Sequence, residues 1–279
     1  MGKDAVMPLR ESLYSVYRKL EQAIVPGLQY SQTIYEQVLK EYLTSESVWL
    51  DLGCGHQILP SWRAAEERKL VQLCKEVVGI DYDQHSLLNH HNVTHRVRGD
   101  ISRLPFRDNY FNLVTANMVV EHLSDPSAQF EEVRRILKPG GHFIFHTPNA
   151  HGYSTAIARL VPGGLKAKLI YLLDGREEED VFETYYKANT PKQVETLAHA
   201  TNFTIVKLKM LATNAIFSLA LPLAIPELLL IRLLMRKRFK NLRTGIIISW
   251  QKPEYDPSRA RLNAVEGTSS AEINKTNAT

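Results

Sequence analysis

Short apolar runs that alternate with segments of helical spacing constrain this fold more than any other feature of the chain. Seven runs have strand-like composition, at residues 47–52, 76–81, 95–100, 111–117, 141–148, 203–211 and 245–252. Strands that alternate with helices form a mostly parallel sheet with helices on both faces. The sequence therefore predicts a doubly wound α/β fold with a seven-stranded, mostly parallel sheet.

Helix signals fall between these runs. Asp125 and Pro126 are typical of an N-cap and a first helical turn, and the breaker cluster at 138–141 should end that helix. Thr190 and Gln193 form a second capping pattern. These signals place helices before and after the fifth run, as an alternating architecture requires.

The first run leads into a sharp corner. Residues 48–60 read VWLDLGCGHQILP, so Asp51 stands near the end of an apolar run and is followed by Gly53 and Gly55. Glycine lets backbone approach a ligand without a side-chain collision. The N–H groups of a following helix favour a negative group, while Asp51 is suited to a cation. A ligand that carries both a carboxylate and an ammonium group would fit this corner.

Polar residues end the neighbouring runs as well. In open α/β sheets the ligand binds outside the carboxyl ends of the strands. That rule singles out Asp51, Asp81, Asp100, Asn117, and the pair His146 and Thr147. Asp81 stands where an acid binds ribose hydroxyls in doubly wound folds, and Asp100 is placed to accept from an exocyclic amine. An amino acid, a ribose and an adenine together describe S-adenosylmethionine.

Four segments of the chain resemble a known family. They read VWLDLGCG, VVGIDYD, GDISRLPFRDNYFNLVTANMVVEHLSDP and RILKPGGHFIFHTPN, and they cover about residues 47–149. In order and spacing they are similar to class I S-adenosylmethionine-dependent methyltransferases of the type-11 group, which includes quinone-biosynthesis enzymes. A glycine loop also suits NAD, but the G-x-G-x-x-G pattern is absent. The resemblance implies a Rossmann-like sheet, methyl transfer and S-adenosyl-L-methionine as the cofactor.

The resemblance also implies a set of cofactor-binding residues. They are Asp51, Gly53 and Gly55 at the methionine end, Asp81 and Tyr82 at the ribose, Asp100 and Ile101 at the adenine, and Asn117 through its backbone. The chain departs from the family at Gln57, where glycine is frequent. This departure predicts either a tighter loop or a side chain that lines the site.

Methyl transfer requires a general base only if the acceptor is a hydroxyl or an acidic carbon. His122 is the first candidate for a catalytic base, with a packing role as the alternative. His146, whose alternative is an ordinary position at the rim, and the pair Tyr185 and Tyr186 follow it. The histidines within 90–95 lack a carboxylate or cysteine at ligand spacing, so no metal site is predicted.

An unusual segment, residues 212–243, separates the last two runs, where the family resemblance implies a tight hairpin. Residues 211–226 carry no charge, and a basic run follows with Arg232, Arg236, Lys237, Arg238, Lys240 and Arg243. A bilayer span needs about 20 apolar residues, and Pro222, Pro226 and Glu227 interrupt this one. If the flanking strands share a sheet, the segment must leave and return on one side of a membrane.

Three interpretations of this insertion stay open. It could lie in a membrane interface as a shallow helix pair whose basic run faces anionic headgroups. It could instead form a soluble lid or dimer contact, or span the bilayer. The interfacial interpretation is favoured because it accommodates the prolines, the charges and the common side of entry and return.

We divide the chain into three parts. Residues 1–46 are predicted to be a helical lid that brings Tyr30 and Gln32 to the cofactor, with a plain packing helix as the alternative. Residues 47–252 form the methyltransferase domain with its apolar and basic insertion. Residues 253–279 are polar and poor in large apolar side chains, so they are predicted to be disordered.

The expected function is methylation of a small hydrophobic or lipid-linked acceptor, at the cytoplasmic face of a membrane with anionic lipids. The net charge of +4, and a basic cluster without interleaved aromatic residues, do not favour nucleic acid. Two cysteines suit a reducing cytoplasm. The alternatives are a soluble methyltransferase of a polar metabolite or sugar and a non-catalytic cofactor-binding adaptor. The acceptor atom and the oligomeric state are left open.

Overall fold

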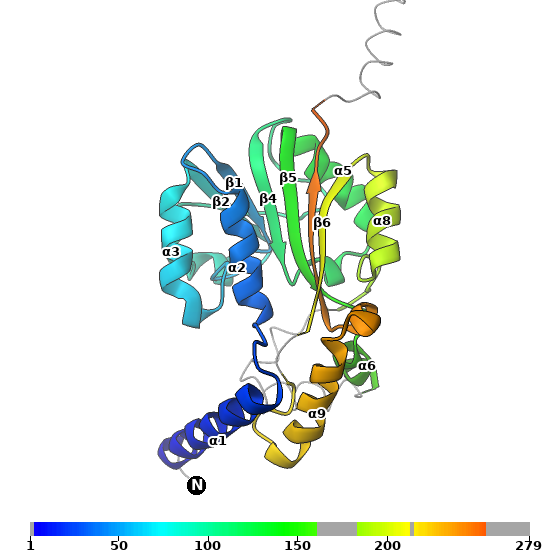
Figure 1. The fold of residues 1–279 in the computed structure, drawn as a ribbon. Helices are drawn as coiled ribbons and strands as arrows, with labels where there is room; N and C mark the ends of the chain where they lie inside the picture. Colours follow the sequence, from blue (N-terminus) through cyan, green and yellow to red (C-terminus); the bar gives the residue numbers. More distant parts are fainter. Residues whose placement is uncertain (1–2, 161–182, 213–214, 255–279) are drawn as a thin grey trace, which may run out of the picture.

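The computed structural model describes residues 3–160, 183–212 and 215–254. Within them, seven strands form one sheet in the order β3-β2-β1-β4-β5-β7-β6 (Figure 1). The strands are β1 (Val48–Leu52), β2 (Glu76–Asp81), β3 (His95–Arg98), β4 (Phe111–Asn117), β5 (Leu137–Pro148), β6 (Thr204–Leu211) and β7 (Gly245–Gln251). Strands β1 to β5 pair in parallel, and β7 is antiparallel to β5 and β6. The predicted doubly wound, mostly parallel sheet is confirmed. Most of the predicted disordered tail, residues 255–279, lies outside the described residues.

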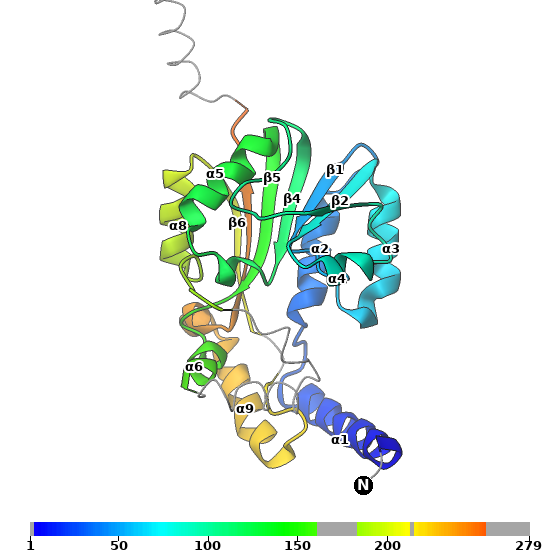
Figure 2. The same cartoon turned by 180° about the vertical axis from the view of Figure 1, so that it is seen from behind.

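Helices cover both faces of the sheet. They are α1 (Lys3–Ile24), α2 (Ser31–Tyr42), α3 (Ala64–Leu73), α4 (Gln84–Leu88), α5 (Pro126–Ile136), α6 (Tyr153–Leu160), α8 (Pro191–Ala200) and α9 (Leu221–Leu234). Helices α2 and α3 lie over one face, and α5 and α8 lie over the other (Figure 1, Figure 2). Each face has its own apolar core, in which Tyr35 of α2 and Phe130 of α5 are fully buried. Burial on both faces explains why the strands are apolar without alternation.

The capping signals act as the sequence predicts. Asp125 accepts a hydrogen bond from the Ala128 backbone at 3.3 Å, with Pro126 as the first residue of α5. Thr190 accepts from the Gln193 backbone at 3.2 Å, at the start of α8. In both cases a short polar side chain satisfies an N–H group that the first helical turn leaves without a partner.

The breaker cluster at 138–141 behaves differently from the prediction. Helix α5 ends at Ile136, but β5 begins at once with Leu137 instead of at residue 141. Leu137 pairs with Phe111, and the register then shifts, so the cluster bulges out of the strand. The buried Lys252 ammonium holds this bulge because it donates to the carbonyls of Arg134 and Leu137, at 2.8 and 2.7 Å. The prediction missed this because the lysine comes from the far end of the chain.

The insertion between β6 and β7 is helical and packs on the N-terminal helix. Ala224, Leu228 and Ile231 of α9 are buried against Tyr17 and Val25 in a third apolar cluster. Helices α1, α6 and α9 all lie beyond the edge of the sheet where β5 ends (Figure 1). In the described part of the chain no helix has the length and apolarity needed to cross a membrane.

Two charged residues of the insertion are structural. The Glu227 carboxylate is 6 % exposed and accepts from Tyr153 Oη at 2.8 Å and from the backbone N–H groups of Ile216 and Phe217. The Arg243 guanidinium donates to three backbone carbonyls, those of Leu234, Met235 and Met210. Arg243 was predicted to face headgroups with the rest of the basic run. That assignment is wrong for this residue, because its donors close the carboxyl end of α9.

Candidate functional site

The turn after β1 uses its two glycines for different reasons. Both have left-handed backbone, with φ of +61° at Gly53 and +52° at Gly55. A side-chain carbon at Gly53 would lie 2.5 Å from Cγ2 of Val119, whereas one at Gly55 would meet nothing within 4 Å. Gly53 therefore lets the turn approach the β4 loop, and Gly55 presents bare backbone to open space.

Alanine at each glycine separates these two roles. We expect Gly53→Ala to lower the free energy of unfolding by roughly 2–5 kcal/mol, because left-handed strain and a collision with Val119 add. Gly55→Ala should cost about 1–2 kcal/mol, because only the backbone strain applies. Urea unfolding of both variants measures the difference, and equal losses would contradict the assigned roles.

Asp81 joins the ends of β1 and β2. Its Oδ2 accepts from the Gly55 backbone N–H at 2.9 Å, and its Oδ1 accepts from the Asp83 N–H at 2.9 Å. Cys54, between the glycines, donates its N–H to the Ile80 carbonyl at 3.2 Å. Each carboxylate oxygen keeps a further acceptor position. The predicted ribose-binding acid thus also shapes the glycine turn.

Asp51 lies inside β1 and is 2 % exposed. Its Oδ1 accepts a hydrogen bond from Thr115 Oγ1, and that hydroxyl accepts from Trp49 Nε1 at 2.7 Å. Burial raises the pKa of Asp51 well above its ordinary value, and the charges of Glu67 and Asp81 act in the same direction. No cation among the described residues forms an ion pair with it. A buried acid without a counter-ion is suited to a cationic ligand.

The raised pKa of Asp51 gives a signed prediction. The unfolded chain loses this proton above about pH 3.9, while the folded, ligand-free protein keeps it. Asp51 therefore lowers stability as the pH rises above that value, by up to about 1.4 kcal/mol per pH unit, until its raised pKa is passed. Asp51→Asn removes this effect and can still accept from Thr115. Thermal melts should show the variant gaining on the wild type as the pH rises above about 4, whereas a constant difference between the two proteins would contradict the argument.

The residues predicted at the adenine lie farther out. Tyr82 is 56 % exposed, and Asp100 is exposed with its Oδ1 accepting from the Ser102 N–H at 2.8 Å. Ile101 is half-buried against the core beneath α5. These positions follow β2 and β3 at the same edge of the sheet as Asp51 and Asp81, where one face of a flat base would find an apolar contact.

Asn117 ends β4, and its side chain is fully engaged. Its Nδ2 donates to Gln32 Oε1 at 2.9 Å and to the Ile58 carbonyl at 3.1 Å. Its Oδ1 accepts from Gln32 Nε2 at 3.2 Å and from Nδ1 of His146 at 3.0 Å. The predicted lid residue Gln32 therefore reaches the sheet. The next residue, Met118, has left-handed φ of 60°, a strained backbone of the kind that clusters at functional sites.

An ion pair anchors α2 over this region. The Glu36 carboxylate is 2 % exposed and receives two hydrogen bonds from Arg63, at 2.6 and 2.8 Å. The preceding residue, Tyr35, is fully buried, and burial first and then the charge of Asp51 raise the pKa of its hydroxyl. Sequence reasoning missed Tyr35 and Thr115, because both occupy positions that periodicity assigns to the core.

His122 lies in the short helix after β4, Val120–His122, at the edge predicted for it. Its Nδ1 donates to the Glu183 carbonyl at 2.6 Å, and its Nε2 is 4.0 Å from Oε1 of Glu121. The Glu121 carbonyl accepts from the backbone of Tyr185 and Tyr186. The candidate base and the tyrosine pair therefore belong to one loop cluster, and a catalytic role for His122 stays a prediction.

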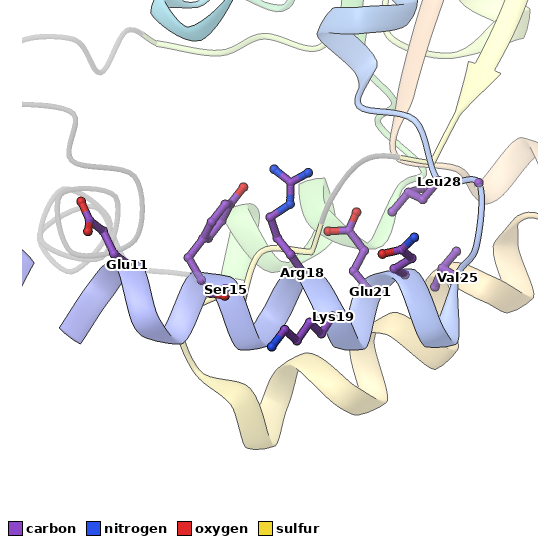
Figure 3. A pocket seen from close by; sticks show the side chains of 10 residues that line it. Glu11, Ser15, Arg18, Lys19, Glu21, Val25 and Leu28 are labelled. Atoms are coloured by element: carbon purple, nitrogen blue, oxygen red, sulfur yellow. The ribbon is translucent and has the colours of Figure 1, made fainter. Parts of the chain in front are cut away.

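A hollow runs along α1 (Figure 3). Arg18 and Glu21 extend from the same side of the helix, with Leu28 beyond its end. Tyr30 donates to Glu21 Oε2 at 3.2 Å and contacts the ring of Trp62 edge-on. No predicted cofactor residue lines this hollow. Tyr30 contacts Glu21 of α1 and Trp62, and its predicted contact with the cofactor stays a prediction.

Comparison with known proteins assigns the region that contains these residues to a family. Residues 50–145, from β1 into β5, match the type-11 methyltransferase family, which is described as "Methyltransferase domain". The protein contains a class I methyltransferase domain of the type-11 group. Domains of this group depend on S-adenosylmethionine. The matched region contains all eight predicted cofactor residues.

Two curated relatives are similar to this chain over part of their length. A demethylmenaquinone methyltransferase of Staphylococcus haemolyticus is 30% identical over 149 residues, which is 51% of this chain and 60% of that protein. A malonyl-[acyl-carrier protein] O-methyltransferase of Nitrosospira multiformis is 30% identical over 123 residues, 40% of this chain and 34% of that protein. The chain thus spans less than two thirds of the length of either relative.

A solved structure with the same fold carries a different activity in its name. The [4+2]-cyclase SpnF superposes with a TM-score of 0.50 and 16% identity, over 80% of this chain and 81% of that chain. A likeness at this level concerns the fold alone. The reaction must therefore be argued from the site.

Proposed function

We propose that this type-11 methyltransferase is an active enzyme that methylates a hydrophobic or lipid-linked acceptor at the cytoplasmic surface of a membrane. The observation that supports it most is Asp51, a buried acid that forms no ion pair with a described cation, beside a glycine turn that Asp81 holds in place. S-adenosylmethionine supplies a sulfonium, an ammonium and two ribose hydroxyls, which match these acids in charge and hydrogen bonding.

The chain's own residues would divide the cofactor among them. Asp51 and the bare backbone at Gly55 would hold the amino-acid end, and Asp81 would accept from the ribose hydroxyls. The adenine would lie between Tyr82 and Ile101. When bound, the cofactor supplies an electrophilic methyl group, and the protein's task is to align an acceptor with it and exclude water. We assign this last task to α2, as the part of the N-terminal lid that covers Asp51.

The acceptor's apolar character is inferred from α9. The helix buries only the stripe that faces α1, and its other side exposes large apolar residues: Leu223, Ile225, Leu229, Leu230 and Leu233, with Met235 just beyond its end. A helix that is apolar all round is normally buried. The exposed apolar side of α9 should therefore be buried against another surface. A lipid bilayer is such a surface, and its anionic headgroups would also suit the basic residues that follow α9.

Charge favours the lipid surface over a protein partner. Arg232, Arg236, Lys237, Arg238 and Lys240 are exposed and make no ion pair with the described acidic residues. Basic residues near an anionic membrane contribute about 1 kcal/mol each. Apolar side chains beside unpaired cations are typical of interfacial helices.

The location of α9 connects this surface with catalysis. Helices α1 and α9 lie beyond the carboxyl ends of the parallel strands, at the end of the sheet that holds Asp51 and Asn117 (Figure 1, Figure 2). An acceptor anchored in a bilayer would approach from this end. The name of the Staphylococcus haemolyticus relative, demethylmenaquinone methyltransferase, is consistent with an acceptor of this kind.

The test has two arms. Calorimetric titration with S-adenosylmethionine measures binding, and high-micromolar ligand without heat would favour a non-catalytic adaptor. Lipid and polar metabolite extracts are then incubated with protein and methyl-labelled cofactor, and the products are analysed by mass. Label in the polar fraction alone would support the soluble alternative, a methyltransferase of a polar metabolite or sugar.

A further inference from the structure

His146, on β5, has one ring nitrogen engaged and the other free. It is 3 % exposed, and its Nδ1 lies 3.0 Å from Oδ1 of Asn117. The amide orientation is fixed, because Asn117 Nδ2 donates to Gln32 and Ile58. An amide oxygen only accepts, so Nδ1 carries the hydrogen and Nε2 keeps its lone pair. Within the part of the chain that the structure describes, Nε2 has no hydrogen-bond partner.

The surroundings of His146 keep its ring neutral. The titratable group against it is Tyr35 of α2, with ring centroids 5.8 Å apart, and its neighbours Asn117 on β4 and Ile247 on β7 carry no charge. Burial lowers the pKa of His146 to about 4. At neutral pH the imidazole is therefore uncharged, and the lone pair on Nε2 is not protonated.

The residue beside the free nitrogen is a glycine. Gly245 is the first residue of β7, where the apolar insertion returns to the sheet. A side-chain carbon at this position would lie 3.5 Å from Nε2 of His146. Nε2 therefore lies beside the point where the insertion returns to the sheet.

We propose that Nε2 of His146 takes the proton from a hydroxyl group of the acceptor, so that the product is an O-methyl compound. The inference rests on the proposed function and names its base and acceptor atom. Asn117 acts as a positioning residue, since it fixes the tautomer. His122 is less suited, because its ring faces the Glu183 carbonyl on one side and the Glu121 carboxylate on the other.

The reaction balances with these groups. The acceptor oxygen forms a bond to the methyl carbon, and the carbon–sulfur bond breaks with its electron pair left on sulfur. The hydroxyl proton moves to Nε2 of His146 and later passes to solvent. One positive charge leaves the sulfonium and one appears on the imidazole, so the site keeps its net charge. A protonated ether is a far stronger acid than imidazolium, so a weakly basic histidine suffices.

Two probes with the same apolar tail test the acceptor atom. 4-Decylphenol presents a hydroxyl that must lose its proton, and 4-decylaniline presents an amine with its own lone pair. Methyl transfer is followed with labelled S-adenosylmethionine. We expect product from the phenol and at least 10-fold less from the aniline, with no inflection in kcat near the ordinary histidine pKa of about 6.5.

Nitrogen-15 NMR of the imidazole gives a readout that does not depend on turnover. In protein loaded with S-adenosylhomocysteine, we expect the Nδ1–H tautomer at pH 7 and a shift of Nε2 when 4-decylphenol is added. The opposite tautomer, or an Nε2 signal that the phenol does not move, would overturn the proposal even if neither probe is methylated.

Three variants locate the effect at His146. His146→Asn should lose at least 100-fold in phenol turnover, in the range that general bases contribute. Gly245→Ala leaves the histidine in place but fills the space before Nε2, and should lose at least 10-fold. Ser249→Ala is the matched control, on the same strand and with a buried hydroxyl that has no partner among the described residues. It should match the wild type.

The outcomes separate this inference from the proposed function. Calorimetry must show that each variant binds S-adenosylmethionine within about 2-fold of the wild type. If the wild type does not bind the cofactor, the proposed function fails and this inference with it. If the cofactor binds but Gly245→Ala and His146→Asn keep full phenol turnover, or the aniline is methylated as fast, only the present inference is wrong.

Discussion

Asp81→Ala is expected to weaken binding of S-adenosylmethionine by about 100-fold. Hydrogen bonds to a charged group contribute roughly 1.5–3 kcal/mol each, and the loss of two ribose contacts therefore amounts to about 3 kcal/mol or more. The variant also frees the Gly55 N–H, which Asp81 holds at 2.9 Å. Asp81→Asn keeps one acceptor oxygen and should lose about 10-fold. Calorimetric titration of folded protein measures both variants.

Asp83→Ala is the matched control for this prediction. Asp83 is two residues away and caps α4, where its carboxylate accepts from the backbone of His85 and Ser86 at 3.1 and 2.9 Å. Loss of the cap should cost about 1 kcal/mol of stability, with cofactor affinity within about 2-fold of the wild type. Equal affinity losses in the Asp81 and Asp83 variants would mean that the local turn, and not a ribose contact, controls binding.

Replacing Ile225, Leu229 and Leu233 together by serine is expected to reduce vesicle binding by about 100-fold. The three residues repeat every four positions on the exposed side of α9 and are 42%, 54% and 38% exposed. Each should contribute on the order of 1 kcal/mol when covered by lipid. Flotation with vesicles of phosphatidylcholine and phosphatidylglycerol measures the change. Because the buried stripe of α9 is untouched, the contact with α1 is kept.

A second triple serine variant controls for general hydrophobicity. Leu73, Leu88 and Val206 are exposed to a similar degree, at 46%, 69% and 48%, but lie on the body of the domain. This variant should float like the wild type. Wild-type binding should also weaken as salt rises, because exposed basic residues take part. If both triple variants bind vesicles equally well, the membrane proposal is wrong, and a surface other than a lipid bilayer contacts the exposed side of α9.

The strands, the helix caps and the glycine turn that position the site could be predicted from the sequence, because each depends on residues that are neighbours in the chain. Apolar runs, capping residues and the glycine turn each act within a few residues, and parallel strands then bring Asp51, Asp81 and Asn117 to one edge. The same rules did not find α4, which begins at an Asp83 cap without a long periodic segment behind it. They also placed the start of β5 too late, since its bulge depends on the distant Lys252.

Contacts between distant segments decided the rest. The sequence determined the seven strands, the acids at their ends and the apolar insertion, because burial and turn geometry impose those patterns on neighbouring residues. Only the tertiary structure decided that Gln32 meets Asn117, that His146 keeps one nitrogen free beside Gly245, and that Arg243 closes α9. Each of these depends on which side chains packing brings within hydrogen-bond distance, and no local pattern encodes that.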